Sequence, residues 1–183
     1  MSTGAATLLT AEEFVRQYEN QRFELFEGRL EEIPMPGTRH GYICGKVVIA
    51  IGAFVEAHKL GRVMSNDTFV QTQKNPDSVR GGDICYWSYE RLPEGEVPIG
   101  LSDQPPDLVV EVHSPTDRWK LIYRKAVEYL EAGVRVVVLL DPKTATVAVM
   151  RPDEIQQVFD NGDTLTIPDV LPGFSVPVKT FFS

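Results

Sequence analysis

Cysteine is scarce in this sequence, which limits how the fold can be held together. Cys44 and Cys85 are the only two thiols in 183 residues, too few for a disulfide framework. No CxxC pair or Cys/His cluster stands out, so the sequence predicts no zinc site. Reduced thiols in a cytoplasm are the simplest interpretation, and we therefore expect a cytoplasmic protein.

Long apolar runs and a basic leader are also lacking. The first residues, MSTGAATLLTAEEF, have neither the positive start nor the apolar stretch of a secretory signal. No later segment offers the run of about 20 apolar residues that a membrane span requires. We therefore expect no membrane association.

Positive charge is in deficit, with a formal net charge of -8 and a pI near 4.9. This balance weighs against a protein that coats nucleic acid without specificity, because such binding needs clustered lysines and arginines. It does not exclude a local basic site. The hydrophobic share of 43% and the charged share of 24% are ordinary for a globular protein. The length suits one domain with a full core, so a single domain over residues 1–183 is predicted.

The first third of the chain predicts two helices and a hairpin. Thr10 and Glu13 form a capping-box pattern, which predicts a helix from Thr10 to about Asn20. The segment RFELFEGRLEEI alternates on either side of Glu27-Gly28 and predicts a β-hairpin. Apolar residues then recur at helical spacing from Gly41 to Leu60, so a long helix is expected there.

The remaining segments alternate strands with one helix. Short strands are predicted in RVMS, TFVQTQ and GDICYW, and a buried strand in PPDLVVEVHSP. A helix is predicted over about 116–132, followed by a buried strand in VRVVVLLD. Strand, helix and strand in succession suggest a crossover between parallel strands. The predicted fold class is α/β or α+β, a mixed β-sheet flanked by helices, with an N-terminal helix and β-hairpin.

The buried strand PPDLVVEVHSP carries a glutamate near its middle. Because the faces of a strand alternate, Asp107, Val109, Glu111 and His113 share one side. Burying a carboxylate there costs free energy unless a positive charge compensates it. Glu111 therefore either pairs with a basic side chain or belongs to a functional site that binds a cation. Asp107 is a poor partner for a shared metal, since four residues of strand span about 13 Å.

A second acid in GGDIC supplies a better partner for Glu111. Asp83 stands just ahead of an apolar strand. Two carboxylates on neighbouring strands suit a hard divalent cation such as magnesium. The spacing alone does not show that these two strands are adjacent.

The helix after Glu111 carries the strongest basic patch of the acidic chain. Counted at about 100° per residue, Lys125 falls at the edge of the buried stripe, while Lys120 and Arg124 point to the far side. Lys125 can reach back toward Glu111, or it can cover apolar surface with its stem. With Arg118 these residues place four positive charges within 118–125, a patch able to meet a phosphate.

Taken in order, several segments resemble the Uma-type family of restriction-endonuclease-like proteins, a branch of the PD-(D/E)XK nuclease superfamily. They are RFELFEGRLEEI, GGDICYW, PPDLVVEVHSPTDR and RKAVEYLEAGVRVVVLLDP, and the likeness extends from about residue 20 to LPGF at 171–174. The resemblance implies a restriction-endonuclease-like core and a magnesium-dependent phosphodiesterase site. It also implies nucleic acid, chiefly DNA, as the partner, Mn²⁺ as a possible substitute, and a homodimer.

The resemblance also assigns roles to individual residues. Asp83 matches the first acid, Glu111 the second, and Lys125 a lysine that has moved from the strand to the next helix. Asp83, Glu111 and the backbone carbonyl of Val112 would hold one Mg²⁺.

Other positions matter less or depart from the family pattern. Glu24, in FEL, His40, near the start of the long helix, and His113 are further pocket candidates, although Glu24 and His40 each also fit a purely structural role. Gly82 stands where proline usually precedes the first acid, which would loosen a turn. His113 replaces the usual lysine and carries no permanent charge at neutral pH, so Lys125 is assigned that function.

The sequence therefore predicts a Mg²⁺-dependent endonuclease that hydrolyses nucleic-acid phosphodiester bonds. Arg118, Lys120 and Arg124 are the candidates for contact with nucleic acid. A catalytically silent nucleic-acid-binding or assembly module that retains the nuclease fold is the alternative, because a fold does not fix a function. The loops near 73–82 and 89–105 show no base-reading motif, so no substrate sequence is predicted.

Overall fold

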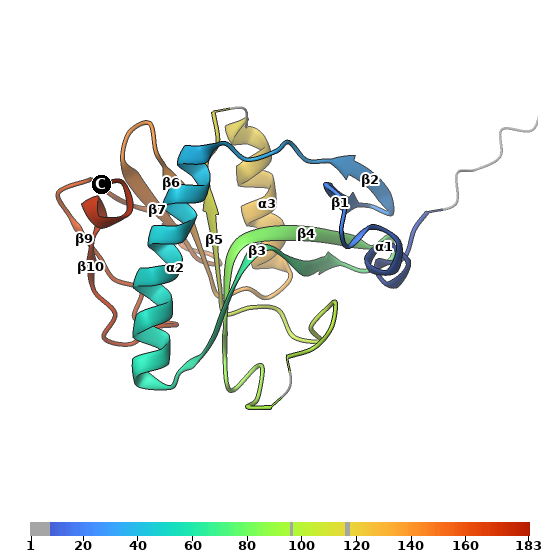
Figure 1. Ribbon diagram of the computed structural model, residues 1–183, viewed down its shortest axis with the longest axis horizontal. Coiled ribbons are helices and arrows are strands. Elements are labelled where there is room, and N and C mark those ends of the chain that lie inside the picture. Colours follow the sequence, from blue (N-terminus) through green and yellow to red (C-terminus); the bar gives the residue numbers. More distant parts are fainter. Residues whose placement is uncertain (1–7, 96, 116–117) are drawn as a thin grey trace, which may run out of the picture.

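The computed structural model describes residues 8–95, 97–115 and 118–183, which form a mixed sheet with helices packed on it (Figure 1). The helices are α1 (Ala11–Tyr18), α2 (Thr38–His58), α3 (Trp119–Glu131) and the short 3-10 helix η1 (Val178–Phe181). The strands are β1 (Phe23–Phe26), β2 (Arg29–Glu32), β3 (Gly61–Gln73), β4 (Ser78–Ser88), β5 (Leu108–Val112), β6 (Val136–Asp141), β7 (Thr146–Met150), β8 (Gln157–Phe159), β9 (Thr164–Leu165) and β10 (Val176–Pro177).

The main sheet contains eight strands in the order β2-β1-β4-β5-β6-β7-β8, and β3 pairs with β4 outside this path. Its strand pairs are antiparallel except β5 and β6, which are parallel and are connected through α3. This connection is the predicted crossover. The two short strands β9 and β10 form a separate sheet. The predicted fold class, a mixed sheet flanked by helices, is confirmed.

Two helices cover opposite faces of the central strands β5 and β6. The even-numbered residues of both strands pack with the buried stripe of α2, and the odd-numbered apolar residues pack with that of α3. Glu111 has the odd numbering, so it lies on the α3 face. The stripe of α2 is Ile43, Val47, Ile51 and Val55, and that of α3 is Ile122, Ala126 and Tyr129.

β1 and β5 pair with different parts of the same edge of β4, and the part of that edge between them is left open. β1 pairs with β4 near its start, with Leu25 opposite Val79, and β5 pairs nearer its end, with Ile84 opposite Val110. In the described part of the chain, neither register includes residues 80–83, while β3 pairs along the other edge. The backbone of this short stretch can therefore bond to side chains from other elements.

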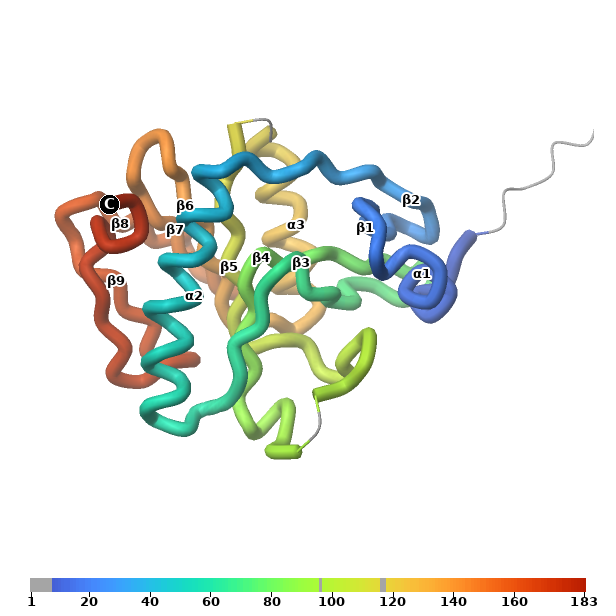
Figure 2. Tube along the Cα trace, in the orientation of Figure 1, coloured from blue at the N-terminus to red at the C-terminus, as the bar shows by residue number. Residues whose placement is uncertain are grey.

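The N-terminal elements lie at one end of the molecule, and the C-terminal segment lies at the other (Figure 2). The capping box of α1 is present, since the Thr10 side chain accepts from the Glu13 amide and the Glu13 carboxylate accepts from the Thr10 amide. α1 ends at Tyr18, two residues before the predicted end. Its Phe14 is buried in a small cluster that fixes the hairpin to the start of β4.

Element boundaries differ from the predictions in ways that affect the site. α2 begins at Thr38 rather than at Gly41, so His40 lies in its first turn. The expected short strands before GDICYW form one strand, β3, with an irregularity between Ser65 and Thr68. The start of the predicted helix at 116–117 lies outside the described residues.

β4 begins at Ser78 rather than at Gly82, which corrects the interpretation of that glycine. Gly82 lies inside the strand, and a Cβ added there would be only 2.5 Å from Cys85 Sγ. The glycine is therefore needed for close packing, and no loosened turn is present at this position.

α2 is long and apolar enough, by length and composition, to cross a membrane. The expectation that no segment is long and apolar enough to span a membrane was therefore wrong. In this fold its apolar stripe packs on the sheet, as in an amphipathic helix that covers a core, and one such helix is weak evidence of a membrane span.

Candidate functional site

A pocket of about 270 Å³ lies at the opening in the edge of β4. The hairpin, the segment between β2 and α2, β4, the end of β5, and α3 supply its walls. Most of the residues predicted from the sequence line it, namely Glu24, His40, Asp83, Glu111, Val112, Arg118, Arg124 and Lys125. The elements β4, β5 and α3 thus bring the two acids and the lysine to one pocket.

Glu111 is buried near the end of β5, with 7% of its surface exposed. The Tyr129 hydroxyl donates to Oε1 at 2.8 Å, and Lys125 Nζ donates to Oε2 at 3.2 Å. The pKa of Glu111 is raised to about 8, chiefly by burial and also by the charges of Asp83 and Glu24, while the charge of Lys125 opposes the shift. A bound cation next to Glu111 would favour the ionised form of this carboxyl.

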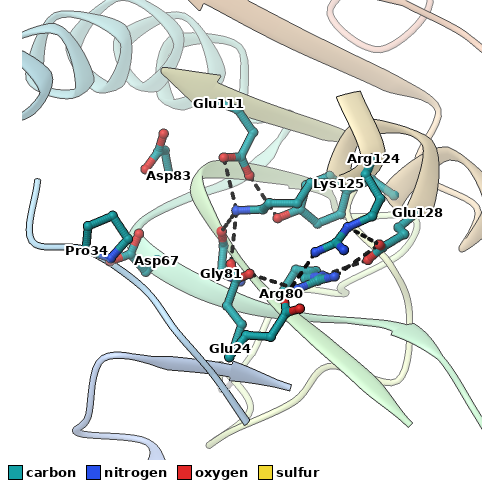
Figure 3. Close-up of polar contacts among 12 residues, drawn as sticks. Glu24, Pro34, Asp67, Arg80, Gly81, Asp83, Glu111, Arg124, Lys125 and Glu128 are labelled. Carbon is teal, nitrogen blue, oxygen red and sulfur yellow. Dashed lines mark hydrogen bonds and ion pairs between the residues drawn. The ribbon is translucent and has the colours of Figure 1, made fainter. Parts of the chain in front are cut away.

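Lys125 lies between two carboxylates (Figure 3). Its Nζ is 3.0 Å from Glu24 Oε1 and 3.2 Å from Glu111 Oε2, and it donates to the Gly81 carbonyl at 3.0 Å. Burial opposes the charge of the amine, but Glu111 and Glu24 outweigh burial and raise the pKa of Lys125. The lysine thus reaches back to the end of β5, which was one of the two arrangements that the sequence left open.

Glu24 reaches the pocket from β1 and fixes Lys125 to the backbone of β4. Its Oε1 accepts from the Gly81 amide at 3.0 Å as well as pairing with Lys125. Burial acts to raise the pKa of Glu24, but Lys125 and Arg80 outweigh it, so the pKa is lowered. A carboxylate held in this way stays ionised and keeps the amine in position.

Arg80 supports Glu24 and was missed by the sequence analysis. The side chain is fully buried in β4, and its Nη1 donates to Glu24 at 3.0 Å and to Glu31 at 2.9 Å. Its Nε and Nη2 donate to the two carboxylate oxygens of Glu128 at 2.6 and 3.0 Å. Charge-assisted, bidentate bonds of this kind fix geometry as well as charge. Arg80 therefore connects the hairpin, β4 and α3 beneath the pocket residues (Figure 3).

Asp83 lies apart from this network, toward α2 (Figure 3). Its Oδ2 accepts from the Val112 amide at 2.7 Å and is 3.2 Å from His40 Nε2. The Val112 amide thus holds the Asp83 carboxylate, and the role of the Val112 carbonyl as a metal ligand stays a prediction. Bonds to Asp83 and then to Cys44 raise the pKa of His40 to about 10, against the effect of burial. His40 therefore presents a positive charge to Asp83.

Cys44 extends the contact from the next turn of α2. Its Sγ is 3.6 Å from His40 Nδ1, and burial raises the pKa of the thiol. His40, Cys44 and Asp83 each offer one ligand atom, and these atoms lie within 4.8 Å of one another. The prediction that no Cys/His cluster exists was therefore wrong. The available signal was the four-residue spacing of His40 and Cys44 on one helix.

The remaining candidates differ in their position relative to the pocket. His113 and Lys120 are not among the described residues that line the pocket. Lys120 is exposed to solvent. The His113 ring stacks on Trp119 with centroids 4.3 Å apart. Arg118 is exposed and lines the pocket.

Arg124 corrects the helical projection, which placed it on the far side of α3. Its Nη2 donates to Glu31 at 3.1 Å, and its Nε is 3.5 Å from Glu128. The guanidinium also lies 4.4 Å from the centre of the Phe26 ring. The hairpin covers this side of the helix, so the side chain is held against β1 and β2.

The donor set of the pocket fits a divalent cation. Asp83 and Glu111 supply carboxylate oxygens, the ligand type that hard cations prefer. The raised pKa of Glu111 shows that the local cations do not offset its burial and its acidic neighbours. A bound cation would supply the missing positive charge.

Comparison with known proteins gives the family and supports the fold. No curated protein matches the chain. The crystal structure of "a putative nuclease belonging to DUF820" from Anabaena variabilis is similar, with a TM-score of 0.83 and 24% identity, over 95% of this chain and 97% of that chain. A likeness at that identity shows the fold. The family model Uma2, described as "Putative restriction endonuclease", matches residues 11–179. The chain therefore belongs to the Uma2 family of restriction-endonuclease-like proteins, as the resemblance of its sequence indicated.

Proposed function

We propose that the protein is a metal-dependent endonuclease that hydrolyses phosphodiester bonds of DNA, with Mg²⁺ as its ion and Mn²⁺ as a substitute. The observation that carries this proposal is the convergence of Asp83, Glu111 and Lys125 on one pocket from β4, β5 and α3. The family description and the nuclease-like fold support the same class of reaction.

Asp83 and Glu111 are the residues that would hold the ion, with the Val112 carbonyl as a further oxygen donor. The bound ion would polarise a phosphodiester oxygen and lower the pKa of a coordinated water. The Val112 amide and His40 both bind Asp83 Oδ2, which orients this carboxylate. The Tyr129 hydroxyl, from α3, orients the Glu111 carboxyl in the same way by donating a hydrogen bond to it.

Lys125 supplies fixed positive charge where a phosphate would be attacked. Glu24 and Glu111 keep the amine protonated and in place, so it costs little reorganisation during the reaction. In the proposal it neutralises charge that develops on the phosphate or orients the attacking water. Arg118, exposed at the pocket, is the best placed candidate for a backbone phosphate of the substrate.

A catalytically silent binding or assembly module is the second candidate. One observation favours it: Lys125 already bonds to Glu24, Glu111 and the Gly81 carbonyl, so it must leave at least one partner to contact a substrate. The net charge of -8 also gives little help in holding a duplex.

The proposal also includes a homodimer in the cytoplasm that acts without a membrane. Two copies of the site would allow both strands of a duplex to be cut. A mass measurement in solution tests the dimer separately from the chemistry.

Cleavage assays on single-stranded, duplex and branched DNA with Mg²⁺ or Mn²⁺ would test the function. The wild type should cleave, whereas Lys125→Ala and Glu111→Ala should not, and the exposed Lys179→Ala serves as the matched lysine control. Calorimetry on the same proteins separates the two candidates. Magnesium binding that requires Glu111 without any cleavage would favour the silent module, and equal binding by the wild type and Glu111→Ala would contradict the metal site.

A further inference from the structure

His40, Cys44 and Asp83 form a second group of metal ligands at the edge of the pocket. The His40 ring lies between the other two, with Nδ1 3.6 Å from Cys44 Sγ and Nε2 3.2 Å from Asp83 Oδ2. Counting one ring nitrogen, the three donor atoms lie within 4.8 Å of one another. All three residues are half-buried, so their side chains are confined by the surrounding fold.

Rigid elements place these three side chains together. His40 and Cys44 are four residues apart on α2, so they project from the same side of the helix. Asp83 lies in β4, one residue before the pairing of β4 with β5 begins at Ile84. The Val112 amide holds the Asp83 carboxylate in this position. A site built on a helix and a strand is better preorganised than one built on loops.

The chemistry of these donors differs from that of the magnesium site. Magnesium prefers oxygen ligands, whereas zinc binds cysteine sulfur, histidine nitrogen and carboxylate oxygen at about 2.0–2.3 Å in tetrahedral geometry. Ligand atoms of one tetrahedral zinc lie about 3.3–3.5 Å apart, so the His40 ring would turn to present one nitrogen to an ion between Cys44 and Asp83, whose donor atoms lie within 4.8 Å of each other. His40 and Asp83 both line the pocket, which gives an ion a route of entry and leaves a fourth position for water.

We propose that the protein binds Zn²⁺ through Cys44 Sγ, one ring nitrogen of His40 and a carboxylate oxygen of Asp83. This site shares Asp83 with the proposed magnesium site, but it uses a thiolate and an imidazole that magnesium binds poorly. The zinc site goes beyond the nuclease proposal and does not depend on cleavage of nucleic acid.

Cobalt and zinc titrations of the full-length, metal-free protein test the site directly. Co²⁺ bound to a thiolate gives a sulfur-to-metal charge-transfer absorption, which we expect in the wild type and which Zn²⁺ should abolish by displacing Co²⁺. Cys44→Ser should lose this absorption and bind Zn²⁺ at least about 10-fold more weakly, because a ligand is removed. His40→Gln should weaken Zn²⁺ binding in the same direction.

Cys85→Ala provides the matched control, since Cys85 is the other thiol, is fully buried and is not one of the three grouped ligands. This variant leaves Cys44 as the only thiol, so it should keep both the absorption and the zinc affinity. A wild type without the absorption, or a Cys44→Ser protein that binds zinc as tightly as the wild type, would overturn the proposal. If Cys44→Ser does not fold, the wild type still decides, because iodoacetamide should alkylate Cys44 more slowly with Zn²⁺ than without it. Equal rates would overturn the site.

Discussion

The two ends of β5 each bury a carboxylate, but the surroundings of the two acids differ. Asp107, just before the strand, is 1% exposed, accepts from the Ser88 amide at 2.8 Å and pairs with Arg91 and Arg135 at 3.3 and 3.4 Å. Glu111, at the other end, shares the one amine of Lys125 with Glu24 and lines the pocket.

This difference separates a structural acid from a candidate functional one. Each bond of Asp107 connects parts of the fold, since Ser88 ends β4 and Arg135 precedes β6. At Glu111 the local cation does not offset burial and two neighbouring acids, so the pKa is raised to about 8. A buried acid in a pocket with a perturbed pKa marks a candidate site, whereas burial alone does not.

The largest effect is expected at Arg80, the buried cation that supports the Glu111 end of the strand. Arg80→Met should lower the free energy of unfolding by about 3–5 kcal/mol, because it leaves buried carboxylates without their partner. Chemical denaturation measures the change. Arg124→Met is the control, and it should cost less than about 1 kcal/mol because that ion pair is partly exposed. Similar losses for both variants would contradict a special role of burial at Arg80.

Glu111→Gln should separate activity from stability. We expect cleavage to fall by about 100-fold or more, because the amide no longer supplies the negative charge that holds the ion. The free energy of unfolding should change by less than about 1 kcal/mol, since the amide keeps the shape of the carboxyl and adds no buried charge. Cleavage assays and denaturant titrations at the same pH would show this. A large loss of stability would show that Glu111 is a structural acid like Asp107, and would contradict the distinction between the two ends of β5.

Asp107→Asn should give the opposite result. The free energy of unfolding should fall by about 1–3 kcal/mol, because the bond to the Ser88 amide and the pairs with two arginines are weakened. Magnesium affinity and the cleavage rate of the folded protein should match those of the wild type. A loss of magnesium binding in this variant would mean that both ends of β5 act on the site.

Per pH unit, the change in magnesium affinity should be the smallest of these effects. Glu111 must lose its proton to bind the ion, so the affinity should rise by up to about 10-fold per pH unit below pH 8 and level off above it. Lys125, His40 and Tyr129 have raised pKa values and stay protonated over this range. Calorimetry from pH 6 to pH 9 measures the slope. Asp107→Asn should keep this profile, whereas the same slope in Glu111→Gln would assign it to another group.

Much of the site was visible in the sequence because its signals are local. Asp83 precedes an apolar strand, Glu111 interrupts another, and Lys125 sits at the rim of a helical stripe. Each of these features follows from a few neighbouring residues and a known period. The family resemblance then assigned them to one pocket, and the structure places them there.

The residues that support the site could not be predicted, because their contacts join parts of the chain that are far apart in the sequence. Arg80 gave no signal because its partner carboxylates are 48, 49 and 56 residues away along the chain. The prediction also began the strand at Gly82, which left Arg80 outside it. Tyr129 lies in the buried stripe of α3, but its bond to Glu111 depends on how α3 packs on β5.

The sequence by itself determined which residues share a face. The period of two in β5 put Asp107 and Glu111 on one side, and the period of 3.6 in α3 placed Lys125 near that side, because backbone geometry fixes both. Only the tertiary structure decided which of the two acids meets a pocket. The pairing of β1 and β5 with separate parts of β4 leaves residues 80–83 open beside Glu111 and not beside Asp107, and strand pairing is set by packing across the whole sheet.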